Sequence, residues 1–112
     1  MTYEYVLTAL ADPTRRAMYA HLRRRPYTVG ELAERVAIRQ PSASEHLRVL
    51  HRAHLVHDRR EGTRRYYAAS TEGLEALHRW LESMWDDVLS AYADAGEAPA
   101  RPRPTPSRKR RP

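Results

Sequence analysis

The sequence predicts a mainly α-helical fold with one β-hairpin, and two observations carry this prediction. Apolar residues recur at helical spacing in five stretches of the chain, and three of these stretches open with a capping residue or a proline. Between the fourth and fifth stretches, two short segments flank Glu61-Gly62-Thr63, where glycine permits the positive φ of a hairpin turn. A chain of 112 residues is the length of one domain.

Two short helices are expected at the start of the chain. The first is indicated by apolar residues at helical spacing, namely Tyr3, Val6, Leu7 and Leu10. It should end before Asp12, which caps the second helix, because Pro13 suits a first helical position whose N–H has no partner. The second helix should pass through Leu22 and stop before Pro26, since proline disfavours helical geometry in the preceding residue.

The third and fourth helices form a pair joined by a short turn. Thr28 and Glu31 make a capping box, which opens a helix with an apolar face formed by Val29, Leu32, Ala33 and Val36. The fourth helix, residues 40–53, has Pro41 in its first turn. Its pattern buries Ala43, Leu47 and Leu50 and leaves outward Ser42, Ser44, Glu45 and Arg48.

The rest of the pattern is a hairpin followed by a long helix. Leu55 to Arg60 and Arg64 to Ala69 are expected to be strands, and the hairpin tip is basic. One apolar stripe predicts the last helix: Leu74, Leu77, Leu81, Met84, Trp85, Val88, Leu89 and Tyr92. This order of elements is that of a winged helix-turn-helix, whose second paired helix enters the major groove of DNA.

Composition and charge narrow the function. Twenty Lys and Arg stand against fourteen Asp and Glu, and a net charge of +6 favours an anionic partner, nucleic acid before a membrane surface. The absence of cysteine excludes a disulfide framework, a thiolate metal site and a cysteine nucleophile. Nothing resembles a nucleophile turn, a glycine-rich phosphate loop or a paired-carboxylate cleft, so no enzyme is expected. Without a membrane-length apolar run or a basic leader, a cytoplasmic location is expected.

Residues 97–112 differ in composition from residues 1–96, which are expected to form the domain. This tail has six Lys and Arg against one Glu, five prolines and almost nothing apolar. Such a segment cannot bury enough surface to offset its ordering entropy, so a disordered tail is predicted. A basic arm that attracts phosphates and a solubilising terminus without a partner both fit it.

Five segments of the chain resemble the ArsR/SmtB-like bacterial transcriptional regulators, particularly the members without thiolate metal ligands. They are Ala9-Leu-Ala-Asp-Pro-Thr-Arg-Arg16, Val29-Gly-Glu-Leu-Ala33, Gln40-Pro-Ser-Ala-Ser-Glu-His-Leu-Arg-Val-Leu50, Leu55-Val56 and Arg59-Arg-Glu-Gly-Thr-Arg-Arg-Tyr-Tyr67. The resemblance covers about residues 3–93 and implies a homodimer on an operator near its own gene, usually a repressor released by a signal. The family usually has glycine at the position of His54, so His54 either adopts left-handed geometry or ends the fourth helix differently.

The resemblance places helix 40–53 in the major groove of double-stranded DNA. The expected contact residues there are Gln40, Ser42, Ser44, Glu45, His46 and Arg48. Arg48 suits a guanine edge and Gln40 an adenine edge, while Glu45 can accept a cytosine amino proton. For His46, a structural role against the helix pair is the alternative.

Basic residues outside that helix extend the expected DNA contacts. The wing, residues 59–65, should touch the minor groove or the backbone through Arg59, Arg60, Arg64 and Arg65. A solvated strand edge is the alternative for these arginines. Arg15 and Arg16 should add backbone contacts, unless Arg16 pairs with an acidic residue.

The apolar stripe of the last helix is wider than so small a body needs. With the first helix, it predicts a self-complementary dimer surface formed by Tyr3, Val6, Leu7, Leu77, Leu81, Met84, Trp85, Val88, Leu89 and Tyr92. The alternative is that both terminal helices close the core of the monomer.

No cofactor is expected, although a weak Ni or Zn site is an open alternative. The family's Cys-x-Cys position holds Ala33 and Arg35, so that metal site is absent. His78 and Glu82 are four residues apart and suit Ni or Zn across a dimer, or else form an ordinary exposed pair. A second group comprises His51, His54 and His57.

The leading hypothesis is therefore a sequence-specific DNA-binding regulator that acts as a homodimer. One alternative is a protein-interaction adaptor, which strong salt dependence of DNA binding would exclude. Another is a regulator whose signal is sensed by a partner protein or by weakly bound Ni or Zn.

Overall fold

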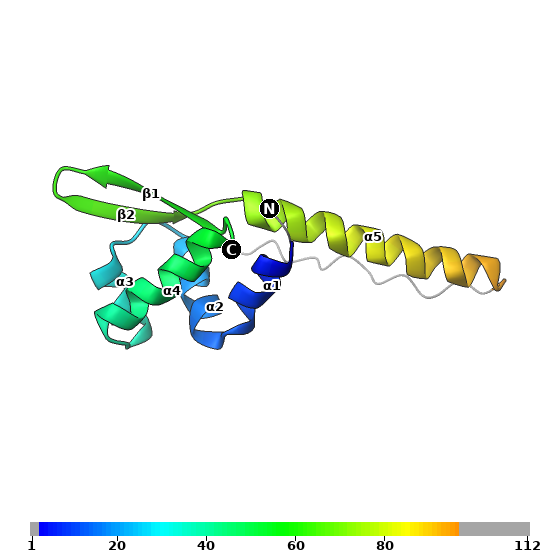
Figure 1. Ribbon diagram of the computed structural model, residues 1–112, viewed down its shortest axis with the longest axis horizontal. Coiled ribbons are helices and arrows are strands. Elements are labelled where there is room, and N and C mark those ends of the chain that lie inside the picture. Colours follow the sequence, from blue (N-terminus) through cyan, green and yellow to red (C-terminus); the bar gives the residue numbers. More distant parts are fainter. Residues whose placement is uncertain (1–2, 97–112) are drawn as a thin grey trace. The chain divides into compact units, whose positions relative to one another are not determined.

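The computed structural model describes residues 3–96, which fall into two units, one up to Leu81 and one from Glu82. The elements follow the predicted order: α1 (Tyr3–Ala11), α2 (Pro13–Leu22), α3 (Val29–Val36), α4 (Gln40–Arg52), β1 (Val56–Glu61), β2 (Arg64–Ala69) and α5 (Glu72–Asp94). Figure 1 shows β1 and β2 as a hairpin beside the helices α2, α3 and α4. No helix among the described residues is long and apolar enough to cross a membrane. The predicted tail, residues 97–112, lies outside the described residues.

The helix starts follow the local chemistry of the sequence. The Asp12 carboxylate accepts a hydrogen bond from the Arg15 N–H at 2.9 Å, which lowers the pKa of Asp12. The Thr28 hydroxyl accepts from the Glu31 N–H at 3.2 Å, and the Glu31 carboxylate accepts from the Thr28 N–H at 3.0 Å. Both predicted caps are therefore confirmed, because each depends on contacts within four residues.

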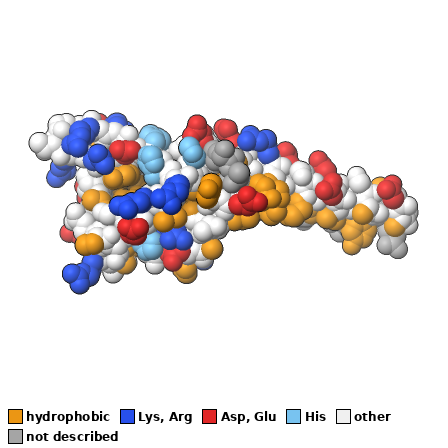
Figure 2. All heavy atoms as spheres, in the orientation of Figure 1, with side chains coloured by type: hydrophobic (Ala, Val, Ile, Leu, Met, Phe, Trp, Pro, Cys, Tyr) orange, Lys and Arg blue, Asp and Glu red, His pale blue; other side chains and the backbone are white. Residues whose placement is uncertain are grey.

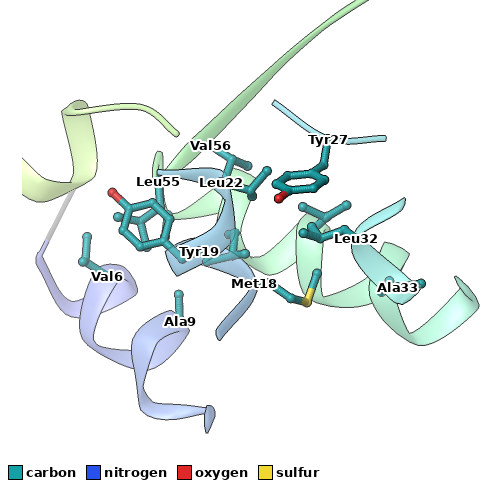
Figure 3. Packing of buried hydrophobic residues seen from close by; sticks show 14 residues of the cluster. Val6, Ala9, Met18, Tyr19, Leu22, Tyr27, Leu32, Ala33, Leu55 and Val56 are labelled. Carbon is teal, nitrogen blue, oxygen red and sulfur yellow. The ribbon is translucent and has the colours of Figure 1, made fainter. Parts of the chain in front are cut away.

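The hydrophobic core joins α1 to α4 with the segment that leads into β1 (Figure 3). Its fully buried large side chains are Met18, Leu32, Leu47, Leu50, Leu55 and Val6. Burial of each such side chain contributes roughly 1.5–3 kcal/mol of transfer free energy. Val6 has no exposed surface, so its predicted place in a dimer interface is wrong and its side chain belongs to the core of the protomer.

The hairpin is antiparallel, with the register running from Val56↔Ala69 to Glu61↔Arg64, and Gly62 takes the positive φ of 65° at its turn. A third piece of extended chain joins it. The Tyr27 N–H donates to the Tyr67 carbonyl at 3.0 Å, and the Tyr67 N–H donates back at 2.8 Å. This bridge attaches the hairpin to the loop between α2 and α3.

The turn after α4 resolves the two alternatives for His54. Its φ is 60°, so the residue adopts the left-handed geometry. The Leu55 N–H then reaches back to the Leu50 carbonyl at 3.0 Å, which satisfies one of the last carbonyls of the helix. The α4 helix ends at Arg52, one residue before the predicted end, and β1 begins at Val56, one residue after the predicted start.

Ala37, between α3 and α4, also adopts left-handed geometry, with φ 59° and ψ 49°. Because a β-carbon is strained there, Ala37→Gly is expected to stabilise the fold by about 0.5–1 kcal/mol, the strain released less the added entropy of the unfolded chain. Urea unfolding followed by circular dichroism measures the change. The matched control is Ala17→Gly, at an exposed position inside α2, which should destabilise by about 1 kcal/mol. Equal destabilisation by both changes would contradict the prediction.

Candidate nucleic-acid interface

One side of α4 is packed on the core and the other is open. Ala43, Leu47 and Leu50 are buried, as predicted. The exposed side includes Gln40, Ser42, Ser44, Glu45 and Arg48, all of which the sequence analysis assigns to DNA contact. Proline in the first turn and the buried apolar spacing thus turn a row of polar side chains outward.

Arg48 is poorly anchored to the protein. Its Nη1 lies 3.7 Å from the Glu45 carboxylate, and both side chains are about two-thirds exposed, at 64% and 66%. Pairs that exposed stabilise a protein little, because water screens them. The Arg48 guanidinium is therefore available to another acceptor at small cost.

The four wing arginines divide between the two faces of the hairpin. Successive strand residues point to opposite faces, and Arg60 pairs with Arg65 in the register. These two arginines therefore share one face, and Arg59 and Arg64 share the other. On that second face Arg59 donates to the Glu61 carboxylate at 2.9 Å. The sequence analysis treats the four as one cluster, because their facing depends on the register.

Tyrosines next to two of these arginines favour their charged form. A side-chain hydrogen bond to Tyr66 raises the pKa of Arg64, and one to Tyr67 raises the pKa of Arg65, where Asp58 adds a smaller effect. Both guanidinium groups are therefore cationic at neutral pH, which suits contact with phosphates. Figure 2 shows basic side chains over the hairpin and over the neighbouring helical surface.

A groove of about 610 Å³ separates α4 from the hairpin. It is lined by Ser44, Leu47, Arg48, His51, Arg52, Asp58, Arg65 and Tyr67. Three of these residues are arginines and one is an acid, so the groove is cationic. The sequence analysis leaves Arg52 out of the DNA-contact set, although its position four residues after Arg48 is a signal for a shared helix face.

Arg15 links α1 to α4. Its Nε donates to the Ala9 carbonyl at 2.8 Å and its Nη2 to the Thr8 carbonyl at 3.2 Å, at the end of α1. Its Nη1 lies 3.3 Å from His46 Nδ1 on α4. This contact favours the structural alternative for His46, while contact of either side chain with DNA stays a prediction.

Arg16 is also turned toward α1. Its Nη1 donates to the carbonyls of Leu10 and Ala11 at 2.7 and 3.1 Å. These are main-chain acceptors rather than the acidic partner considered in the sequence analysis. The bonds satisfy carbonyls that α1 leaves unpaired at its C-terminus, and a DNA contact of Arg16 stays a prediction.

The histidines that suggest a metal site lie apart. His51 Nε2 is 3.3 Å from the Asp58 carboxylate, His54 Nδ1 is 3.3 Å from the Glu72 carboxylate, and His57 is exposed on β1. Within residues 3–96, no group of three or more potential ligands is placed to hold a metal ion. His78 lines a shallow pocket of about 440 Å³ with Thr71, Leu74, Glu75 and Arg79.

Apolar side chains remain exposed on both terminal helices. Leu7 is 42% exposed and Leu81 45%, while Tyr3 stacks on Trp80 with ring centroids 4.5 Å apart. Exposed apolar residues that the sequence analysis leaves out of the dimer set are Tyr5 and Leu74. In the second unit the exposed ones are Met84, Val88 and Tyr92, and the half-buried ones are Trp85 and Leu89. Leu77 is partly buried against the core of the first unit.

Known proteins resemble this chain in sequence and in structure. The family model described as a helix-turn-helix domain matches residues 10–59. The HTH-type transcriptional regulator Rv2034 of Mycobacterium tuberculosis is 47% identical over 85 residues, which are 76% of this chain and 79% of the relative.

Two solved structures extend the likeness to the fold. An ArsR-like transcriptional regulator from Rhodococcus sp. RHA1 has a TM-score of 0.71 and 28% identity, covering 85% of this chain and 92% of that one. The homodimeric winged helix-turn-helix DNA-binding domain Mb0332 of Mycobacterium bovis, a possible ArsR-family regulator, has a TM-score of 0.60 and 30% identity, covering 75% and 78%. The chain belongs to the ArsR-like family of winged helix-turn-helix transcriptional regulators.

Proposed function

We propose that this chain is a sequence-specific DNA-binding regulator that acts as a homodimer on operator DNA, and that it carries out no catalysis. Helix α4 reads the major groove, and the wing, residues 59–65, binds the minor groove or the backbone. The observation that carries the proposal is the exposed polar face of α4 beside a hairpin with four arginines, across a cationic groove. Such a protein meets its operator in the cytoplasm.

Residues on α4 divide by the acceptor that they suit. Arg48 is assigned to a guanine edge, because a guanidinium donates two parallel hydrogen bonds to it. Gln40 is assigned to adenine, and Ser42 and Ser44 to phosphates or base edges. Glu45 has the chemistry to accept from a cytosine amino group and is held beside Arg48 until DNA binds.

The terminal helices are proposed to form the dimer. Leu7, Leu81 and the exposed apolar residues of the second unit are more than a small monomer usually leaves open to water. The homodimeric state of the Mycobacterium bovis domain supports this assignment. Two-fold symmetry then presents two copies of α4 to half-sites about 34 Å apart, one turn of DNA.

The test is binding of the whole chain to the duplex upstream of its own gene and to a scrambled duplex of equal length. Fluorescence anisotropy across a salt series should give a tighter affinity for the upstream duplex, and sedimentation equilibrium should give a dimer. Equal affinity for the two duplexes would contradict sequence-specific regulation. Weak salt dependence would favour the adaptor alternative, because few counterions would be released.

The inducing signal is proposed to be a small ligand, a partner sensor protein or a weakly held ion. For an ion, the proposed ligands are His78 and Glu82, with Ni²⁺ or Zn²⁺ as the metals that suit imidazole. The same binding series with and without each metal tests this assignment. Loss of the metal effect in His78→Gln would support it, and an unchanged effect would contradict it.

The wing makes a separate prediction. Arg60→Ala combined with Arg64→Ala is expected to weaken binding to both duplexes by the same factor, because backbone contacts do not depend on sequence. The slope of log affinity against log salt should become shallower by about 1.8, or about 0.9 for each lost phosphate contact. The control combines Arg23→Ala with Arg24→Ala, two exposed arginines at the end of α2 that remove the same charge. If the wing variant and the control had the same slope as the unchanged chain, the wing contact would be wrong.

A further inference from the structure

Asp58 of β1 connects the hairpin to α4. One carboxylate oxygen lies 3.3 Å from His51 Nε2 on α4, and the other lies 3.4 Å from Arg65 Nε on β2. The Asp58 side chain is 29% exposed, less than its partners His51 and Arg65 at 56% and 51%. It lines the cationic groove between the two elements.

Neither DNA affinity nor stability accounts for an acid at this position. A carboxylate in a groove that faces DNA repels phosphates, so it lowers the affinity for DNA of any sequence. Ion pairs with such exposed partners add little to the stability of a fold. What the two contacts do constrain is the angle between the hairpin and α4, because they join side chains from three elements.

We propose that Asp58 is a positioning residue that sets the wing at the angle which lets α4 and the wing contact DNA together. The inference rests on the proposed DNA-binding function and deepens it. Specific binding requires both elements to meet adjacent grooves in one register, so a wing that pivots loses operator affinity.

The backbone register shows where the pivot lies. Asp58 is paired with Tyr67 across the hairpin, and Tyr67 is the residue bridged to Tyr27. The hairpin is therefore held at one level from both sides, by the main-chain bridge and by the Asp58 carboxylate. Beyond this level, residues 59–65 extend as a two-stranded ribbon. Without Asp58, the ribbon turns about the Tyr27–Tyr67 bridge.

The neighbouring charges keep this link formed. His51 Nε2 donates to the carboxylate whether the imidazole is neutral or protonated, provided that the neutral ring carries its proton there. Arg65 is a permanent cation, and Arg48 and Arg52 line the same groove. The carboxylate is therefore surrounded by donors from α4 and from β2.

The sign of a mutational effect tests the proposal. Asp58→Ala is expected to lower operator affinity about fivefold, the loss of one partly exposed ion-pair link, while affinity for the scrambled duplex stays equal or rises. The matched control is Glu61→Ala, which removes an acid from the same strand whose printed partner is Arg59, within the hairpin. Glu61→Ala should raise both affinities by the same factor. Asp58→Asn, which keeps an acceptor oxygen, should restore part of the lost discrimination.

A second measurement separates this inference from the proposed function. Backbone ¹⁵N relaxation of the DNA-free chain should show larger motion at Gly62 in Asp58→Ala than in Glu61→Ala. If Asp58→Ala raised operator affinity as Glu61→Ala does, the positioning role would be overturned. If the unchanged chain had no preferred duplex, the proposed function would fail, and unchanged Gly62 dynamics in Asp58→Ala would still overturn the inference.

Discussion

Arg48→Ala is expected to weaken binding to the operator by about tenfold to a hundredfold, because a good bidentate contact to a base contributes roughly 1–3 kcal/mol of discrimination. Binding to a scrambled duplex should change by about twofold, the effect of one lost charge near the backbone. The side chain is 64% exposed and its contact with Glu45 is 3.7 Å long, so the protein holds it loosely before DNA binds.

The matched variant for this prediction is Arg48→Lys, which keeps the charge and removes the planar pair of donors. Titration of both duplexes with each variant, at one salt concentration, gives the two affinity ratios. Arg48→Lys should lose most of the discrimination and little of the affinity for scrambled DNA. A loss in Arg48→Ala that is equal on both duplexes would assign Arg48 to the backbone instead of a base.

Gly73→Ala is expected to destabilise the fold by about 2–3 kcal/mol, at the upper end of what an overpacked methyl group costs. A β-carbon at Gly73 would lie 2.5 Å from the Ala53 carbonyl oxygen and 3.0 Å from the His54 carbonyl oxygen. These are main-chain atoms, which cannot rotate aside as a side chain can. The start of α5 would have to move away, and the bond of 2.8 Å from the Gly73 N–H to the His54 carbonyl would break.

Helix propensity alone gives the opposite sign for this substitution, because alanine is about 1 kcal/mol more favourable than glycine inside a helix. Gly30→Ala in α3 serves as the control, since its β-carbon would meet only the Gln40 side chain, at the ordinary distance of 3.6 Å. Urea unfolding followed by circular dichroism should show stabilisation by Gly30→Ala and destabilisation by Gly73→Ala. If both variants were stabilised, the close approach at Gly73 would be refuted.

Local chemistry accounts for how well the elements were predicted. Asp12 and Thr28 cap helices through bonds to residues three positions away, so their effect is present in the sequence itself. The apolar spacing of α4 defines its buried side, and the exposed side follows from it. The candidate major-groove residues were therefore predictable before any coordinates.

Parts of the site depend on strand register and stayed beyond the sequence. A shift of one residue exchanges the two faces of a strand, so the separation of Arg60 and Arg65 from Arg59 and Arg64 required the pairing. The contact of Asp58 with His51 joins residues on different elements, and no periodicity in the sequence encodes it.

By itself, the sequence determined the order of the helices and strands, their capped starts, the outward face of α4 and the basic hairpin, because each depends on residues within a turn of one another. The tertiary structure decided which side chains meet across elements. It placed Val6 in the core, turned Arg15 toward α1 and His46, and set the hairpin against the Tyr27 segment. These contacts join residues far apart in the chain, and they form only when the buried faces pack together.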